Sequence, residues 1–290
     1  MTIPREYHIV LALLGTSTHN WPELRPVPWR ALAAIDRWTH ASSSFGTRLD
    51  AILLYHSVGG VPGTDYRWDL PTDIFREQIR ALNSRFEIVD LKRLVAEPNT
   101  ATKRVAITFD DGFRNVFENA VPILREFGAP ATVFCCPTYI NDDNLSRLRE
   151  RHDMDDGAHN VIMSDSQIQA LADDPLFALG NHTSTHPNLK TVTDENQRRE
   201  EIVGGKQAIE DRFGVTVDRF AYPYGKFDDT AARIVAETHD IAVASEPSLI
   251  GLDRDAYRLP RIDGCQPASV LCFEMSDISH RLRMLMRRIG

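Results

Sequence analysis

The chain lacks the features that mark membrane-spanning, nucleic-acid-binding and disulfide-stabilised proteins. None of its hydrophobic runs approaches the roughly 20 apolar residues of a membrane-spanning helix. It has no excess of positive charge, and its formal net charge of -8 argues against nucleic acid as a partner. It has only four cysteines, at positions 135, 136, 265 and 272, and no CxxC pair. This sparse cysteine pattern favours a reducing compartment.

What remains is an ordinary globular composition, 42% hydrophobic and 26% charged, in a chain of 290 residues that can bury a sizeable core. The apolar run HIVLALLG at 8–15 is at the short limit for a signal sequence, and Arg5 and Glu6 cancel in front of it. We therefore expect the mature protein to begin near residue 1. The corresponding expectation for location is cytoplasmic, with an extracytoplasmic location as the alternative.

Two adjacent carboxylates end an apolar run in the stretch VAITFDDGF at 105–113. Strand-forming residues deliver Asp110 and Asp111 to one place, and Gly112 permits a sharp turn behind them. Like charges in a half-buried site repel each other unless a cation lies between them or one carboxylate is protonated. Read alone, the pair is equally consistent with the N-cap of a helix that begins near Phe113.

A second cluster, NHTSTHPNL, favours the metal-binding interpretation. It follows another apolar run, at 176–180, and contains His182 and His186. Four-residue spacing would place both imidazoles on one side of a helical turn, where both can reach one ion. The sequence thus predicts a His/His/Asp site for a divalent metal with open coordination positions.

Apolar runs alternate with helical patterns through most of the chain, which favours a parallel sheet or barrel. The run DAILLYH at 50–56 predicts a strand buried on both faces. His56 stands at the end of this strand, as Asp110 stands at the end of the later one. Strands are also predicted at 86–89, 103–109, 131–136, 176–180, 218–221 and 241–244. A helix is predicted from Pro71 on, with Ile74, Phe75, Ile79 and Leu82 on one stripe. Further helices are predicted at 91–96, 113–127 (interrupted by Pro122), 194–213 and 231–238.

The predicted domain organisation is an N-terminal extension at 1–48 and one domain at 49–290. A polar insertion at 141–161 interrupts the alternation; it carries His152, His159 and several aspartates, which we interpret as a solvated loop rather than a metal cluster. A C-terminal helix places Leu282, Leu285, Met286 and Ile289 on one side, among arginines. We expect this helix to dock on the protein rather than touch a membrane surface.

The motifs TFDDG, HTSTH and YPYG, in this order, resemble those of the polysaccharide deacetylases of the NodB-homology kind, carbohydrate esterase family 4. The resemblance covers about residues 50–265 and implies an α/β fold, a distorted (β/α)7 barrel. It also implies that Asp110 is the general base. By the same resemblance Asp111, His182 and His186 hold a divalent metal, usually zinc.

The resemblance further implies that Tyr222, Pro223 and Tyr224 line the acetyl pocket, with the Tyr224 backbone N–H stabilising the oxyanion. Members of the family usually carry an arginine in this turn to orient the catalytic aspartate, but Ala221 takes its place here. Arg219 and Arg261 are the candidate replacements, and Arg261 is favoured because it would reach the site from a separate strand end.

The sequence YHSV at His56 resembles the branch of the family that acts on poly-N-acetylglucosamine, in which the acid histidine comes first in the chain. His56 is accordingly the predicted general acid. The predicted function is metal-dependent removal of N-acetyl groups from an amino-sugar glycan, its expected binding partner. The alternatives are an O-acetyl esterase or small-substrate amidase on the same scaffold, and a catalytically silent carbohydrate-binding protein.

Overall fold

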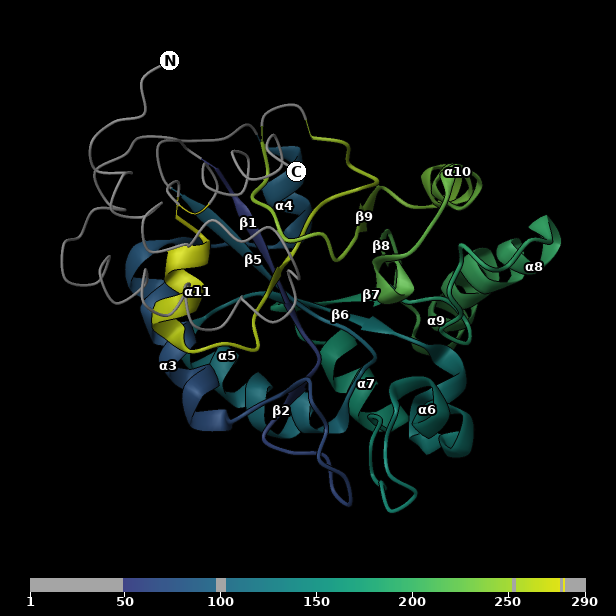
Figure 1. Cartoon of the computed structure of the whole chain (residues 1–290), viewed down its shortest axis with the longest axis horizontal. Helices are drawn as coiled ribbons and strands as arrows, with labels where there is room; N and C mark the ends of the chain where they lie inside the picture. Colours follow the sequence, from purple (N-terminus) through teal and green to yellow (C-terminus); the bar gives the residue numbers. More distant parts are fainter. Residues whose placement is uncertain (1–48, 98–102, 252–253, 277–278, 280–290) are drawn as a thin grey trace, which may run out of the picture. The chain divides into compact units, whose positions relative to one another are not determined.

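The computed structural model describes residues 49–97, 103–251, 254–276 and 279 (Figure 1). Residues 49–266 form one compact unit, and the described residues from Pro267 on, which include helix α11 (Ala268–Glu274), belong to a second. The predicted N-terminal extension and the basic C-terminal stripe at 282–289 lie outside the described residues.

A parallel sheet of eight strands organises the larger unit. Its central strands are built from β-branched and aromatic residues and are buried along their whole length, as expected for strands covered on both faces. Along the sheet the order is β10-β1-β5-β6-β7-β8-β9, and β4 pairs with β5. The strands are β1 (Ala51–Tyr55), β4 (Glu87–Ile88), β5 (Arg104–Phe109), β6 (Ala131–Cys135), β7 (Phe177–Asn181), β8 (Arg219–Ala221), β9 (Ile241–Val243) and β10 (Ile262–Asp263).

One short segment, residues 259–263, connects the two ends of this sheet. Leu259 forms a parallel bridge with Val243 of β9, and three residues later Ile262 pairs with Leu53 of β1. The sheet therefore curls toward closure, and seven strands lie along its main path. The prediction of a distorted (β/α)7 barrel is confirmed.

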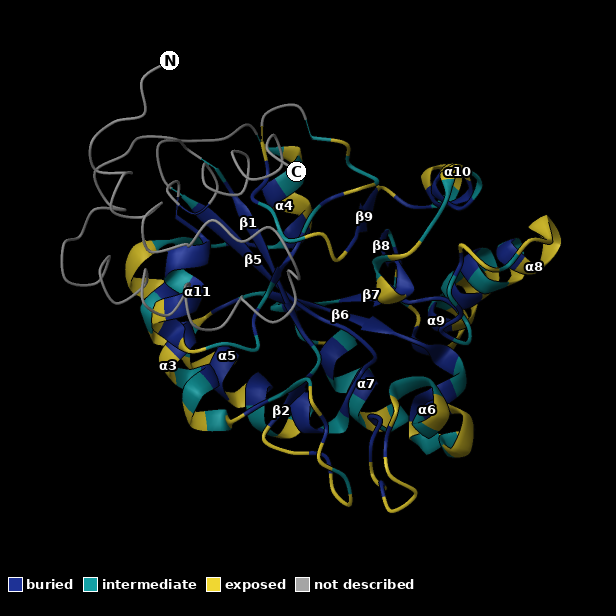
Figure 2. Cartoon of the chain, viewed as in Figure 1, coloured by how far each residue is buried: buried dark blue, intermediate teal, exposed yellow. Residues whose placement is uncertain are grey.

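Helices cover the sheet, with exposed residues on their outer surfaces and buried residues toward the strands (Figure 2). In α3, for example, Phe75, Ile79 and Leu82 are buried at helical spacing. The helices of this unit are α3 (Thr72–Arg85), α4 (Leu91–Ala96), α5 (Val121–Phe127), α6 (Leu145–His152), α7 (Asp165–Ala172), α8 (Glu195–Arg199), α9 (Gly205–Phe213) and α10 (Asp229–Thr238).

Two predicted long helices each contain a π-helical turn. The turn η2 (Val116–Ala120) precedes α5, so that Pro122 lies in the first turn of α5, directly after the π-helical turn. The turn η4 (Glu200–Gly204) joins α8 to α9. Such turns are frequent at functional sites.

The segment at 141–161 is not simply the solvated loop that the sequence predicted. It contains α6, and Leu148 and Ala158 within it are fully buried. The segment is also tied to the loop at residues 59–63, because the backbone N–H of His159 donates to the carbonyl of Pro62 at 3.2 Å.

Gly205, the first residue of α9, allows the helix to approach the end of β7 closely. A Cβ atom on Gly205 would lie 2.7 Å from Asn181 Oδ1 and 2.8 to 2.9 Å from backbone atoms of Thr183 and Ser184. The loop between these residues carries His182, so the glycine lets α9 support a candidate site residue.

We predict that Gly205→Ala destabilises the protein. Alanine favours a helix by about 1 kcal/mol over glycine, but overpacking against backbone costs about 1–3 kcal/mol. Gly251→Ala is the matched control, since a Cβ there meets nothing within 4 Å. Urea unfolding of both variants measures the difference; equal stabilities would show that α9 does not pack this tightly.

Candidate active site

The candidate site lies where parallel strands end. The backbone N–H of Asp110 donates to the carbonyl of Tyr55 at 2.9 Å, so Asp110 and His56 follow the ends of neighbouring strands β5 and β1. Asp111 has a left-handed backbone (φ 70°), as does Gly112 (φ 73°). This sharp turn separates the two carboxylates and gives them different partners.

Asp110 forms a bidentate ion pair with Arg261. The two guanidinium nitrogens lie 2.7 Å from the two carboxylate oxygens, and both side chains are almost completely buried. Arg261 is held in turn by the carbonyl of Ala244 at 2.8 Å and by Thr108 Oγ1 at 3.1 Å. Burial by itself raises the pKa of Asp110, but the charge of Arg261, with His182, outweighs burial and lowers the pKa to about 2.

Arg219, the other candidate for this role, points elsewhere. Its guanidinium pairs with Asp90 at 2.9 Å and Asp218 at 3.2 Å. Although Arg219 shares a strand face with Ala221, it lies two residues earlier, about 6.6 Å farther from the strand end.

Asp111 has no such cation. Both of its oxygens are buried and have no hydrogen-bond partner among the described residues. Burial and the neighbouring charge of Asp110 raise the pKa of Asp111 well above its usual value. Instead, Oδ1 of Asp111 lies 3.5 Å from Nε2 of His182 and 3.5 Å from Nε2 of His186. The structure thus brings together the three residues predicted to bind a metal.

The two histidines do not lie on a helical turn, and that part of the prediction is wrong. Thr183 and His186 have left-handed backbones (φ 66° and 54°), which interrupt any helix. The hydroxyl of Thr183 accepts a hydrogen bond from the His186 backbone N–H at 2.9 Å and closes the loop on itself. The imidazoles converge because the loop folds back, not because of helical periodicity.

Glu201, in the π turn η4, anchors this loop from behind. Its carboxylate accepts hydrogen bonds from the N–H and the hydroxyl of Thr185, at 2.8 and 2.7 Å. His182 is oriented separately, because its Nδ1 lies 2.8 Å from the carbonyl of Ala221 and donates to it. The tautomer that this bond requires leaves the lone pair of Nε2 directed toward Asp111.

His56 lies beside Asp110 with its ring stacked on Trp68, the ring centroids 5.7 Å apart. Its Nδ1 is buried without a hydrogen-bond partner among the described residues. Burial lowers the pKa of His56 to about 4, although the charge of Asp110 opposes the shift. Trp68 was not singled out by the sequence, which gives no periodic signal in the irregular stretch before α3.

The turn Tyr222-Pro223-Tyr224 places its first two residues in the core and the third at the surface. Tyr222 is fully buried, stacks on Phe227 with centroids 4.0 Å apart, and donates its hydroxyl to the carbonyl of Tyr257 at 3.1 Å. The Tyr222 side chain therefore belongs to the core, and the prediction that this turn forms a wall of the acetyl pocket stays a prediction for its backbone and for Tyr224. Pro223 is also buried, whereas Tyr224 is 45% exposed and has a left-handed backbone (φ 58°).

The ring of Tyr224 lies against His186, with centroids 4.6 Å apart, and its hydroxyl donates to the carbonyl of Arg151 at 3.3 Å. Tyr224 also lines an open cavity of about 460 Å³ together with Arg147, Glu150 and Arg151 of α6. The turn and α6 therefore flank the histidines from one side.

His152, the last residue of α6, reaches the same place, which corrects the prediction of a solvated loop. Its side chain is 6% exposed, and its Nε2 lies 3.7 Å from Asp111 Oδ1. The signal was present in the sequence, because His152 follows the apolar Leu148 by four residues and so shares its buried helix face. His159 and the aspartates at 153, 155 and 156 are exposed, as predicted.

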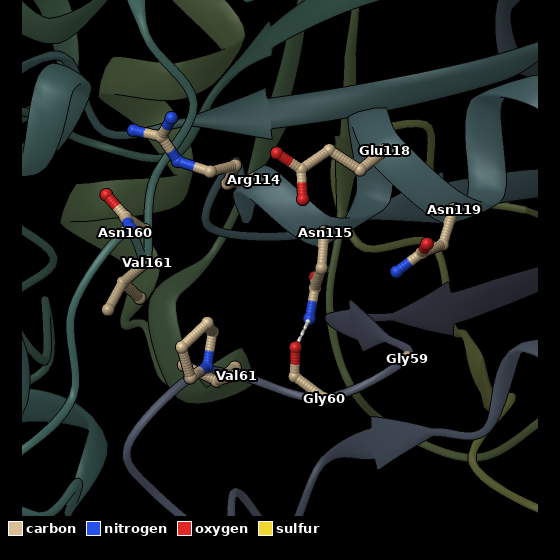
Figure 3. Close-up of a pocket in the computed structure, with 10 residues that line it drawn as sticks. Gly59, Gly60, Val61, Arg114, Asn115, Glu118, Asn119, Asn160 and Val161 are labelled. Carbon is tan, nitrogen blue, oxygen red and sulfur yellow. Dashed lines mark hydrogen bonds between the residues drawn. The ribbon is translucent and has the colours of Figure 1, made fainter.

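A second cavity, of about 320 Å³, lies between the loop after β2 (Ser57–Val58) and the start of η2 (Figure 3). Arg114, Asn115 and Glu118 contribute polar groups to it, and Asn115 donates to the carbonyl of Gly60 at 2.7 Å. No aromatic side chain is among its lining residues, so it offers hydrogen bonds but no face on which a sugar ring could stack.

The residues around Asp111 fit a divalent cation. Zinc takes carboxylate oxygen and imidazole nitrogen at about 2.0–2.2 Å, so two ligands in tetrahedral geometry lie about 3.4 Å apart. The separations of 3.5 Å match this value and are too long for good hydrogen bonds. A buried carboxylate without a donor, facing imidazole lone pairs, is the arrangement that a metal requires.

Comparison with protein families agrees with this arrangement. A family model described as polysaccharide deacetylase matches residues 97–242, about half of the chain. The chain belongs to the polysaccharide deacetylase family. The matched segment contains Asp110, Asp111, His182 and His186, whereas His56 and Arg261 lie outside it.

Individual polysaccharide deacetylases are similar at low identity. The poly-beta-1,6-N-acetyl-D-glucosamine N-deacetylase of Staphylococcus epidermidis is 24% identical over 200 residues, 65% of each chain. Among solved structures, IcaB from Ammonifex degensii matches with a TM-score of 0.63 at 20% identity, covering 79% of this chain and 96% of that one. Streptococcus pyogenes deacetylase PplD matches with a TM-score of 0.65 at 19% identity, covering 79% and 98%.

These likenesses support the fold, and the alignments span between 54% and 70% of the curated relatives' own length. Within the described residues of this family member, no helix is both long and apolar enough to cross a membrane.

We predict that Arg261→Met lowers the free energy of unfolding by about 3–5 kcal/mol, because it leaves the buried carboxylate of Asp110 without its cation. Arg219→Met is the matched control; its partners Asp90 and Asp218 are partly exposed, and a loss of about 1 kcal/mol or less is expected. Chemical denaturation at neutral pH measures both. Similar losses in the two variants would contradict the special role of the Arg261 pair.

Proposed function

We propose that this polysaccharide deacetylase is a metal-dependent hydrolase that removes N-acetyl groups from an amino-sugar glycan and releases acetate. The observation that carries the proposal is the division of the two aspartates, with Asp110 paired to Arg261 and Asp111 facing imidazoles. One carboxylate is thus oriented and charged, and the other is available to a cation.

Asp111, His182 and His186 would hold the ion, and their nitrogen-rich donor set favours zinc. A bound divalent cation supplies Lewis acidity toward the acetyl carbonyl and lowers the pKa of water. The chain's own residues must orient the reactants and move protons.

Asp110 is the proposed general base. Its pKa of about 2 keeps it ionised at neutral pH, and the bidentate contact with Arg261 fixes the direction of its remaining lone pairs. It takes a proton from the attacking water as oxygen adds to the acetamide carbon. The Tyr224 backbone N–H is the proposed donor to the developing oxyanion.

His56 is the proposed general acid, which protonates the leaving amine. Because burial lowers its pKa to about 4, His56 is neutral at pH 7 in the free enzyme. The role requires His56 to take up a proton from solvent before the amine leaves, and the negative charge of Asp110 favours this uptake electrostatically.

The proposed substrate is based on the name of a relative. The Staphylococcus epidermidis relative is named for poly-beta-1,6-N-acetyl-D-glucosamine, and we propose a β-linked N-acetylglucosamine polymer or precursor as the substrate here. The catalytically silent alternative was suggested by the missing turn arginine, and the contact of Arg261 with Asp110 removes that reason for it.

We predict that the zinc-loaded protein releases acetate from β-1,6-linked N-acetylglucosamine oligomers and that Asp110→Asn and His56→Ala each reduce the rate by at least about 10²-fold. Both variants should still bind zinc, whereas Asp111→Ala should not. Acetate release and zinc content are measured on the same preparations.

Acetylated xylan is assayed in parallel. Faster release from xylan than from the amino-sugar oligomers would indicate an O-acetyl esterase. Glycan binding without acetate release from either substrate would indicate a silent binding protein. Full activity in Asp110→Asn would reject Asp110 as the base.

A further inference from the structure

Three imidazoles, not two, converge on one oxygen of Asp111. Nε2 of His152 lies 3.7 Å from Asp111 Oδ1, close to the 3.5 Å of His182 and His186. The ring centroid of His152 is also 4.9 Å from that of His186. Ligand atoms of Asp111, His152 and His186 all lie within 4.8 Å of one another, and His182 is not part of this group. Nε2 of His152 is therefore nearly as close to Asp111 Oδ1 as Nε2 of His182 and His186 are.

The facing atoms have no partners within the described part of the chain. Nε2 of His152 and both oxygens of Asp111 are buried without a hydrogen bond there. The 3.7 Å separation is too long for a hydrogen bond but near the roughly 3.4 Å expected between two ligands of a tetrahedral zinc ion. Burying such groups unpaired is costly, and a cation shared between them removes the cost.

The other ring nitrogen of His152 is oriented from outside the cluster. Nδ1 lies 3.5 Å from the hydroxyl oxygen of Tyr66, whose ring packs on Phe113 with centroids 5.1 Å apart. When Nδ1–H faces this oxygen, Nε2 keeps its lone pair toward Asp111. Metal-binding histidines commonly place their second nitrogen against such an oxygen.

The helix that carries His152 is fixed rather than free to swing away. Beyond the helix, Thr64 donates its hydroxyl to Asp155 at 2.9 Å, and Gly63 and Gly157 pack so closely that a Cβ on Gly63 would lie 2.0 Å from the Gly157 carbonyl oxygen. Arg149 also donates to the carbonyl of Ala158 at 2.9 Å. The insertion therefore holds the end of α6 over the site.

We infer that His152 is a fourth protein ligand of the divalent cation, supplied by the insertion at 141–161 in addition to Asp111, His182 and His186. The inference rests on the metal site of the proposed function but concerns a residue which that function does not need. Its consequence is that the insertion tightens the hold on the ion. Four protein ligands fill a tetrahedral ion, so the proposed hydrolysis then requires a fifth coordination position for water.

The test compares His152→Gln with His159→Gln in the full chain. His159 belongs to the same insertion but is exposed, so it is the matched control. After removal of metal by a chelator, zinc affinity is measured by competition with a chromophoric chelator. We expect Kd to rise by tenfold or more in His152→Gln and to change by less than about twofold in His159→Gln.

An unchanged affinity in His152→Gln would overturn the inference. Asp111→Ala, measured in parallel, separates this failure from that of the proposed function. If Asp111→Ala loses zinc and His152→Gln does not, the three-ligand site survives; if neither loses zinc, the proposed metal site fails as well.

Cobalt substitution gives an independent readout in case His152→Gln does not fold. In His152→Ala, the cobalt d–d bands in the visible spectrum are expected to change in position and intensity, because one ligand is lost. His159→Ala should keep the spectrum of the unsubstituted protein. An unchanged cobalt spectrum in folded, cobalt-loaded His152→Ala would contradict the inference.

Discussion

The bidentate pair between Asp110 and Arg261 is the interaction on which the rest of the site depends. It joins the end of β5 to the segment 259–263, which also connects β9 with β1 as the barrel curls toward closure. Two buried charges are stable here only because they satisfy each other with good geometry. The segment that closes the barrel therefore also supplies the arginine that keeps the proposed base ionised.

The pair also decides what Asp111 can do. With Arg261 committed to Asp110, the second carboxylate is buried without a cation, and its pKa rises. The positive backbone angle of Asp111 points it toward the loop of His182 and His186 rather than toward the arginine. Adjacent residues of the same type thus acquire opposite electrostatic environments, which suits one for proton transfer and the other for metal binding.

Much of the site could be predicted because polar residues at the carboxyl ends of parallel strands meet at one edge of the sheet. That rule places His56, Asp110 and His182 together without knowledge of the loops. Arg261 was favoured over Arg219 by the same reasoning, since Arg219 begins its strand and Arg261 lies at the junction beside β10. The alternation of predicted strands and helices likewise indicated a parallel sheet or barrel.

The failures have local causes. Helical spacing of His182 and His186 suggested a helix, but left-handed residues within a loop produce the same proximity. The motif at 222–224 did not show which of its side chains enter the core, and the structure buries Tyr222 and leaves Tyr224 exposed. His152 was dismissed because the polar composition of its segment concealed one buried helix face, which depends on long-range packing with Tyr66 and Phe113.

The most direct test of this account is a crystal structure of the zinc-loaded protein with anomalous diffraction at the zinc edge. The account predicts one strong peak within bonding distance of Asp111, His182 and His186, with His152 as the additional ligand inferred above and with Asp110 still bound to Arg261 and not to the ion. A peak coordinated by Asp110, or no peak near Asp111 in protein that contains zinc, would contradict it.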